Sequence, residues 1–265
     1  MYATTYHRPK SLAEAASLVS SASEAKLLAG GMTLLPTMKQ RLAAPENLVD
    51  IGRLDELKGI TVSADAVTIG AGVKHADVAA SAEVARAIPA LAHLAGLIGD
   101  PAVRHMGTLG GSVANDDPAA DYPAAVLGLG ATVVTNKRSI AADDFFAGMF
   151  ETALGEGEII VRIVFPIPEK AGYEKFPNPA SRYAMCGVFA AKTRSGPRVA
   201  VTGAGASGVF RVPAMEHALA SNWSPEAVAG IAVDPSNMLS DIHGSAEYRA
   251  HLVTVMAKRA VAAAG

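Results

Sequence analysis

The chain has 265 residues, of which half are apolar and 18% are charged. This composition supplies enough apolar material for a packed core and excludes an intrinsically disordered chain. The 23 basic and 25 acidic residues leave a net charge of −2, and the lack of a basic stretch argues against nucleic acid as a partner. No apolar run reaches the roughly 18 residues of a membrane span. The N-terminus shows no apolar signal segment, so we expect a cytoplasmic protein. At roughly 150 residues per domain, the length predicts one or two domains.

The cysteine and histidine content limits the inorganic chemistry that this chain can carry. The single cysteine, Cys186, cannot form a disulfide within the chain and cannot supply the thiolates of an iron–sulfur cluster. None of the seven histidines stands in a His-x-His or His-x-x-x-His pair, so we expect no metal site on this chain. Any redox chemistry here therefore requires an organic cofactor.

The N-terminal third predicts alternating helices and strands. Ser11 and Glu14 form a capping box that starts a helix ending near residue 21. Residues 26–29 predict a short strand that ends at a Gly-Gly pair. Residues 34–42 predict a helix, since apolar residues recur there at spacings of three and four. Two further strands are expected at 47–51 and 66–69.

The middle of the chain changes from helix to strand. Residues 75–98 are rich in alanine and are interrupted by Pro89, which predicts two helices because proline ends a helix. A glycine-rich stretch at 107–131 separates them from a strand at 132–135. Residues 158–165, EIIVRIVF, predict another strand.

Four prolines between residues 166 and 179 mark the best domain boundary in the sequence. Beyond it we expect strands at 186–193 and 198–202 and helices near 213–221, 225–232 and 244–262. The order of elements predicts an α+β chain, with a larger N-terminal part and a smaller part after about residue 170.

Two diglycine segments carry the most specific chemical signal. They read AGGMTLL at residues 29–35 and GTLGGS at residues 107–112. Adjacent residues without Cβ can adopt positive φ and present successive N–H groups to an anion. The hydroxyls of Thr33, Thr108 and Ser112 add donors beside them. Two such nests face to face fit a pyrophosphate, although each segment is equally consistent with a simple tight turn between strand and helix.

A third glycine-rich segment, GAGASG at residues 203–208, matches the dinucleotide-binding pattern G-x-G-x-x-G. That pattern requires a helix beginning at its last glycine, whose N-terminus meets the phosphates. Here VFRVP follows, which is strand-like and then interrupted by proline. We interpret this segment as a loop.

Four segments together resemble one family. They are LLAGGMTLLPTMKQRLAAPENLVDI (27–51), IGDPAVRHMGTLGGSVANDDPAADYPAAVLGLGA (98–131), YEKFPNPASRYA (173–184) and SDIHGSAEYRAHLV (240–253). In this order they resemble the medium, FAD-binding subunit of molybdenum hydroxylases, the group of carbon monoxide and xanthine dehydrogenases. The similarity runs nearly from end to end.

The resemblance implies a two-subdomain FAD-binding fold of the vanillyl-alcohol-oxidase/MurB-like (PCMH) type. It places the FAD-binding domain at residues 1–170, with subdomains of about 1–55 and 56–170. A small C-terminal α+β domain is expected at 171–265. FAD would be held non-covalently between the two subdomains.

The resemblance also implies a set of cofactor-binding residues. The pyrophosphate would be held by the first motif through backbone N–H groups, and by the second through Thr108, Gly111 and Ser112. Asn115 and Asp121 would reach the ribityl, ribose or adenine side, although Asp121 can also be read as a turn-capping residue. Ile98, Ile160 and Lys175 match positions near the isoalloxazine ring; for Lys175 an exposed place on a linker is an equal alternative. The residues of the first motif are Leu28, Ala29, Gly30, Gly31, Met32, Thr33 and Leu34.

One position departs from the family pattern, because many relatives carry His or Gln where this chain has Met32. If only the backbone N–H is used there, methionine costs nothing. If a side-chain donor is needed, FAD binding weakens by about 1–3 kcal/mol. We favour the backbone interpretation.

The resemblance assigns the other cofactors to partner subunits. Molybdopterin is expected on a large subunit and two [2Fe-2S] clusters on a small one, in a dimer of heterotrimers. This chain would relay electrons from the clusters through FAD to an external acceptor, and no catalytic acid or base is expected on it. The alternatives are a stand-alone FAD-dependent oxidoreductase of the same fold and an assembly subunit that has lost its flavin.

Overall fold

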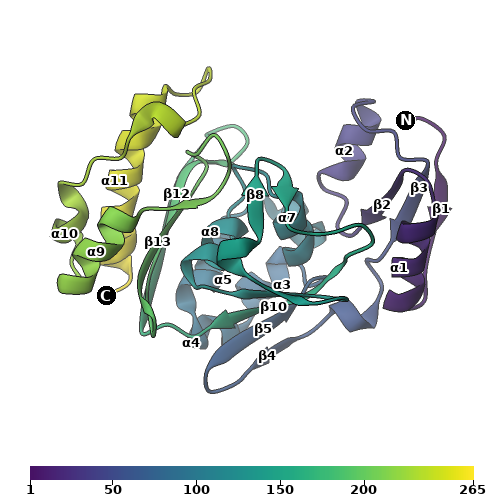
Figure 1. The fold of residues 1–265 in the computed structure, drawn as a ribbon, viewed down its shortest axis with the longest axis horizontal. Coiled ribbons are helices and arrows are strands. Elements are labelled where there is room, and N and C mark those ends of the chain that lie inside the picture. Colours follow the sequence, from purple (N-terminus) through teal and green to yellow (C-terminus); the bar gives the residue numbers. More distant parts are fainter.

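The computed structural model describes all residues from 1 to 265. Three units follow one another along the longest axis of the molecule, from the N-terminal unit at one end to the C-terminal helices at the other (Figure 1). None of the helices has both the length and the apolar character needed to cross a membrane.

The N-terminal unit is a small parallel sheet with a helix on each connection. Ser11 caps the first helix by accepting from the N–H of Glu14 at 3.2 Å. The Glu14 carboxylate reaches back to the N–H of Lys10 at 2.7 Å, so the predicted capping box is present with its return bond one residue earlier. The sheet has the order β1-β3-β2, with all pairs parallel. Its elements are β1 (Thr5–His7), α1 (Leu12–Ser21), β2 (Ala25–Leu28), α2 (Leu34–Lys39) and β3 (Asn47–Asp50).

The middle unit is a five-stranded antiparallel sheet with its helices against one face. The strand order is β4-β5-β10-β6-β7, and the largest apolar core lies between this sheet and the helices. Its elements are η1 (Asp55–Leu57), β4 (Ile60–Val62), β5 (Ala66–Gly70), α3 (His75–Ala80), α4 (Ala82–Ala87), α5 (Pro89–Gly96), α6 (Pro101–Met106), α7 (Leu109–Asn115), α8 (Tyr122–Gly128), β6 (Thr132–Thr135), β7 (Ser139–Ala141), η2 (Ala142–Asp144), β8 (Phe146–Gly148), β9 (Glu151–Thr152) and β10 (Ile160–Pro166).

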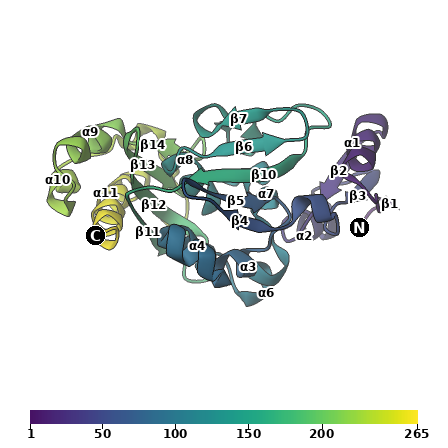
Figure 2. The ribbon, with the colours of Figure 1, turned by 90° about the horizontal axis from the view of Figure 1, so that it is seen from below.

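The C-terminal unit is a four-stranded antiparallel sheet covered on both faces. In β12, Cys186, Val188 and Ala190 belong to a core shared with the C-terminal helices. Phe189 and Ala191 belong to the core of the middle unit. Because successive strand residues point to opposite faces, both faces are buried and the strand reads as a continuous apolar run. The elements are β11 (Lys170–Pro177), β12 (Ala184–Thr193), β13 (Gly196–Thr202), β14 (Phe210–Arg211), α9 (Pro213–Ser221), α10 (Pro225–Ala229), η3 (Pro235–Asn237) and α11 (Ala246–Ala263). Figure 2 shows these helices on the far side of the sheet from the middle unit.

Several elements differ from the sequence predictions. The segment 75–98 forms three helices instead of two, because Ser81 ends one helix and caps the next through the N–H of Val84. The proline-rich segment contains a full strand, β11. The glycine-rich stretch 107–131 is mostly helical, since it contains α7 and α8.

Candidate flavin site

A large cavity lies between the N-terminal and middle units. Its volume is about 770 Å³, within the usual range for small-molecule sites of about 300–1,000 Å³. The carboxyl ends of the parallel strands β2 and β3 open onto it through Ala29 and Gly52. The middle unit contributes residues from α6 and α7 and from the loop before β10, and the β11–β12 connection adds residues 180–183.

The first diglycine motif forms an anion cradle. Gly31 has φ +70°, a conformation that glycine adopts without strain. The backbone N–H groups from Ala29 to Leu34 donate no hydrogen bond to any carbonyl of the chain. Residues 28–34 all line the cavity. This run of uncommitted donors fits an anion that accepts several hydrogen bonds at once, as predicted for this motif.

The second motif is different from the predicted nest. Its glycines have no positive φ, and the segment is the first turn of α7, which Thr108 caps by accepting from the N–H of Gly111 at 3.2 Å. The N–H of Gly110 donates to Ala71 O at 2.8 Å. A Cβ at Gly110 would lie 2.4 Å from that of Ala71, so this glycine serves close packing. The motif therefore offers hydroxyl groups to the cavity, and few free amides.

The two motifs nevertheless meet at one place. A Cβ at Gly30 would lie 2.2 Å from Met106 O and 2.7 Å from the Cα of Gly107. A Cβ at Gly111 would lie 3.8 Å from that of Ala29. The predicted pyrophosphate grip requires such a shared cleft.

Asp121 lines the cavity and is held by two donors from β11. It accepts from the hydroxyl of Tyr173 at 2.6 Å and from the ammonium of Lys175 at 2.9 Å. Burial raises the pKa of Asp121, while Lys175 and Tyr173 oppose that rise. Asp121 precedes α8, but its side chain does not cap the helix, so the alternative reading as a turn cap is wrong.

Lys175 stands behind the cavity wall. Its side chain is only 3% exposed and also donates to Leu97 O at 3.0 Å. The alternative of an exposed linker lysine is therefore wrong. Lys175 does not itself line the cavity, but it contacts Asp121, which does.

The remaining predicted residues all line the cavity: Ile98, Thr108, Gly111, Ser112, Asn115 and Ile160. Ile160 is buried at the start of β10. Ile98 stands just before α6, where Arg104 fixes the backbone by donating to Ile98 O at 2.9 Å and Gly99 O at 3.1 Å.

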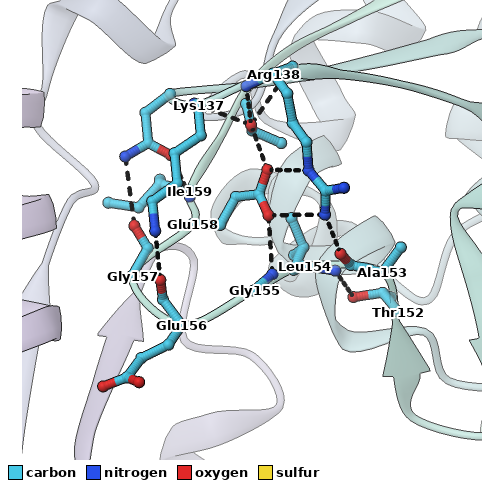
Figure 3. A network of polar contacts seen from close by, with 12 residues as sticks. Lys137, Arg138, Thr152, Ala153, Leu154, Gly155, Glu156, Gly157, Glu158 and Ile159 are labelled. Atoms are coloured by element: carbon cyan, nitrogen blue, oxygen red, sulfur yellow. Dashed lines mark hydrogen bonds and ion pairs between the residues drawn. The ribbon is translucent and has the colours of Figure 1, made fainter.

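An ion pair between the half-exposed Arg138 and the buried Glu158 orders the loop before β10, which forms one wall of the cavity (Figure 3). Arg138 donates to both carboxylate oxygens of Glu158, at 3.0 and 3.1 Å. Thr135 and the N–H of Gly155 donate at 2.7 and 2.8 Å. The Arg138 hydrogen bonds, aided by Gly155 and Thr135, lower the pKa of Glu158 to about 2 despite its burial.

The sequence predictions missed several residues of the cavity wall. His75 is 4% exposed, and burial, together with the charge of Arg104, lowers its pKa to about 4. Phe150 and Tyr183 line the cavity and keep about half of their surface exposed. Tyr183 lies inside the segment 173–184, which resembles the family, but no spacing pattern in the sequence identifies His75 or Phe150.

The segment 203–208 contributes nothing to the cavity. It is a loop followed by the short strand β14, and the next helix begins only at Pro213. Its interpretation as a loop is confirmed.

The residues present fit a flavin dinucleotide. The cradle of residues 29–34 supplies donors for a diphosphate, and the hydroxyls of Thr33 and Ser112 make no hydrogen bond within the chain. Apolar residues such as Ile98 and Ile160 supply contact area for rings. No cluster of three or more histidine, cysteine or acidic residues could hold a metal ion.

Comparison with known proteins agrees with this geometry. Residues 2–168 match the family described as the FAD binding domain in molybdopterin dehydrogenase. The chain is 37% identical to the carbon monoxide dehydrogenase medium chain of Hydrogenophaga pseudoflava, covering 98% of this chain and 96% of the relative. It is 35% identical to the nicotine 6-hydroxylase medium subunit of Paenarthrobacter nicotinovorans, covering 99% and 98%.

A solved structure of reconstituted CO dehydrogenase from Oligotropha carboxidovorans superposes with a TM-score of 0.91 at 32% identity, covering 100% of this chain and 99% of that chain. The expected α+β fold is confirmed by this match. The chain belongs to the FAD-binding medium subunits of molybdopterin-dependent dehydrogenases, a family of oxidoreductase subunits.

Proposed function

We propose that this cavity holds one FAD non-covalently and that the chain passes electrons from the iron–sulfur clusters of a partner to an external acceptor. The observation that carries the proposal is the run of uncommitted backbone N–H groups at residues 29–34, where the second motif closes on the first. FAD, when bound, supplies the redox chemistry, and the protein supplies binding, orientation and electrostatics.

The residues take the following roles in this proposal. The cradle holds the diphosphate through backbone amides, so the side chain of Met32 has no role in binding. Thr108, Gly111 and Ser112 complete the grip, and Asn115 and Asp121 face the sugar or ribityl hydroxyls. Ile98 and Ile160 contact the ring system. Lys175 does not contact the cofactor and instead positions Asp121, whose carboxylate lies 2.9 Å from the Lys175 ammonium.

We further propose the partners: a large subunit with molybdopterin and a small subunit with two [2Fe-2S] clusters, assembled as a dimer of heterotrimers. The relatives with similar medium chains are named for different donors, carbon monoxide and nicotine. This supports donor recognition on another subunit. The cytoplasmic location and the domain limits at about residues 55 and 170 stay predictions; the end of the family match at residue 168 supports the second limit.

Purification tests the proposal. We expect a yellow chain with about one FAD per polypeptide that copurifies with a large and a small subunit. Colourless protein after gentle purification would contradict FAD binding. Full turnover of a donor by the isolated chain would contradict the relay and favour the alternative, a stand-alone oxidoreductase.

A further inference from the structure

One buried polar side chain of the cavity wall has no partner in the protein. The imidazole of His75 is 4% exposed and lines the cavity. Its Nδ1 is enclosed and makes no hydrogen bond. A buried polar atom without a partner is costly, so the retained imidazole needs an explanation.

The surroundings hold the imidazole in one orientation. The ring packs against Tyr122, with centroids 5.3 Å apart and planes at 48°. The N–H of His75 donates to Gly107 O at 3.1 Å, which fixes the backbone beside the second motif. A Cβ at Gly107 would lie 2.6 Å from Nε2. Any residue other than glycine at this position would place its Cβ against that nitrogen.

The same glycine places His75 beside the anion cradle. The Cα of Gly107 lies 2.7 Å from where a Cβ of Gly30 would stand. Gly107 therefore lies close both to the imidazole of His75 and to the first motif. With Nδ1 enclosed, Nε2 is the nitrogen through which the ring can meet a ligand. A neutral imidazole with the proton on Nε2 is a hydrogen-bond donor.

We infer that His75 is a diphosphate-binding residue, whose Nε2–H donates to the FAD diphosphate held by the cradle of residues 29–34. This inference rests on the proposed function. It adds a side-chain donor from α3 to a grip otherwise made by backbone amides and hydroxyls. It also gives a reason for the glycine at position 107, because the side chain of a larger residue would block the Nε2–H donor.

Two amide variants separate the two ring nitrogens. The side-chain nitrogen of Gln reaches the position of Nε2, whereas that of Asn reaches only the position of Nδ1. FAD and ADP binding to the full chain, freed of flavin, is measured by calorimetry for wild type, His75→Gln, His75→Asn and His75→Leu. Riboflavin, which lacks the diphosphate, serves as the comparison ligand. Urea unfolding of each apo-variant reports the fold.

We expect His75→Asn and His75→Leu to bind FAD and ADP about 10- to 100-fold more weakly, as for a lost hydrogen bond to a charged group. His75→Gln should bind both nearly as tightly as wild type, and riboflavin binding should be equal in all four proteins. Unchanged ADP affinity in His75→Asn, or equal losses in the Gln and Asn variants, would overturn the inference. Failure of the wild-type chain to bind FAD would instead overturn the proposed function, and the inference with it.

Discussion

The contact between the two glycine motifs can be tested with one added methyl group, Gly30→Ala. The new Cβ would stand 2.2 Å from Met106 O and 2.7 Å from the Cα of Gly107. Both atoms belong to the backbone, so no side-chain rotation relieves the overlap. Restoring ordinary contact requires a backbone shift of about 1 Å. That shift strains the bonds from Gly107 N to Val103 O at 2.7 Å and from His75 N to Gly107 O at 3.1 Å.

The magnitude follows from the packing. Overfilling a close contact costs about 1–3 kcal/mol of the free energy of unfolding. The shift should also weaken FAD binding, because it displaces the first motif relative to the second and so moves the two sets of diphosphate-binding groups apart. A lost hydrogen bond to a charged group costs about 1.5–3 kcal/mol, which is about 10- to 100-fold in affinity. Gly30→Ala should therefore fold and bind FAD about 10- to 100-fold more weakly than wild type.

The assay is a fluorescence titration of the apo-chain with FAD, beside urea unfolding of the same sample. Gly230→Ala is the matched control, because a Cβ there meets nothing within 4 Å and the residue lies outside the cavity. FAD affinity at the wild-type level in Gly30→Ala, with a stable fold, would refute the idea that the motifs close on one diphosphate.

Three further outcomes follow from the buried polar groups. Lys175→Met should lower the free energy of unfolding by about 3–5 kcal/mol, because it leaves the Asp121 carboxylate buried without its cation; urea unfolding measures this, and a loss below about 1 kcal/mol would contradict the pairing. The folded pKa of Glu158, about 2, lies below its ordinary 4.5, so its stabilising contribution is complete above about pH 4.5 and is lost as the pH falls toward 2. Glu158→Gln should accordingly flatten the acid side of the stability curve, and an unchanged curve would contradict the assignment. Thr108→Val removes the cap of α7 and should cost about 1 kcal/mol in urea unfolding; a stability equal to wild type would show that the cap contributes nothing.

The local sequence predicts the first motif well, because the cradle depends on neighbours in the chain. Gly31 supplies the positive φ, and residues 29–34 follow directly from β2. The second motif looks similar as a sequence but is a helix start. The N–H groups of Leu109 and Gly110 donate to Val73 O and Ala71 O. These acceptors lie nearly 40 residues earlier in the chain, so no local pattern reveals them.

Long-range pairing also explains the other misses. β1 was not predicted because its three residues become a strand only by pairing with Asn47, Leu48 and Val49. The place of Lys175 depends on the alternation of β11, which directs both Tyr173 and Lys175 to a carboxylate more than 50 residues earlier. Such contacts are properties of the folded chain, and sequence spacing carries no trace of them.

The carboxylates of the cavity leave the backbone amides of the cradle free to bind a ligand. Four carboxylates line it, and each already has a donor within the chain: Asp100 from Val103 N, Asp117 from Ala119 N, Asp121 from Tyr173 and Lys175, and Glu158 from Arg138. The acids are thereby committed, and the uncommitted donors include the amides of residues 29–34. Because the cradle binds through backbone groups, it requires glycines where the backbone must converge. It constrains the adjacent side chains much less. In our proposal this is why a methionine, 37% exposed at position 32, can stand inside the motif.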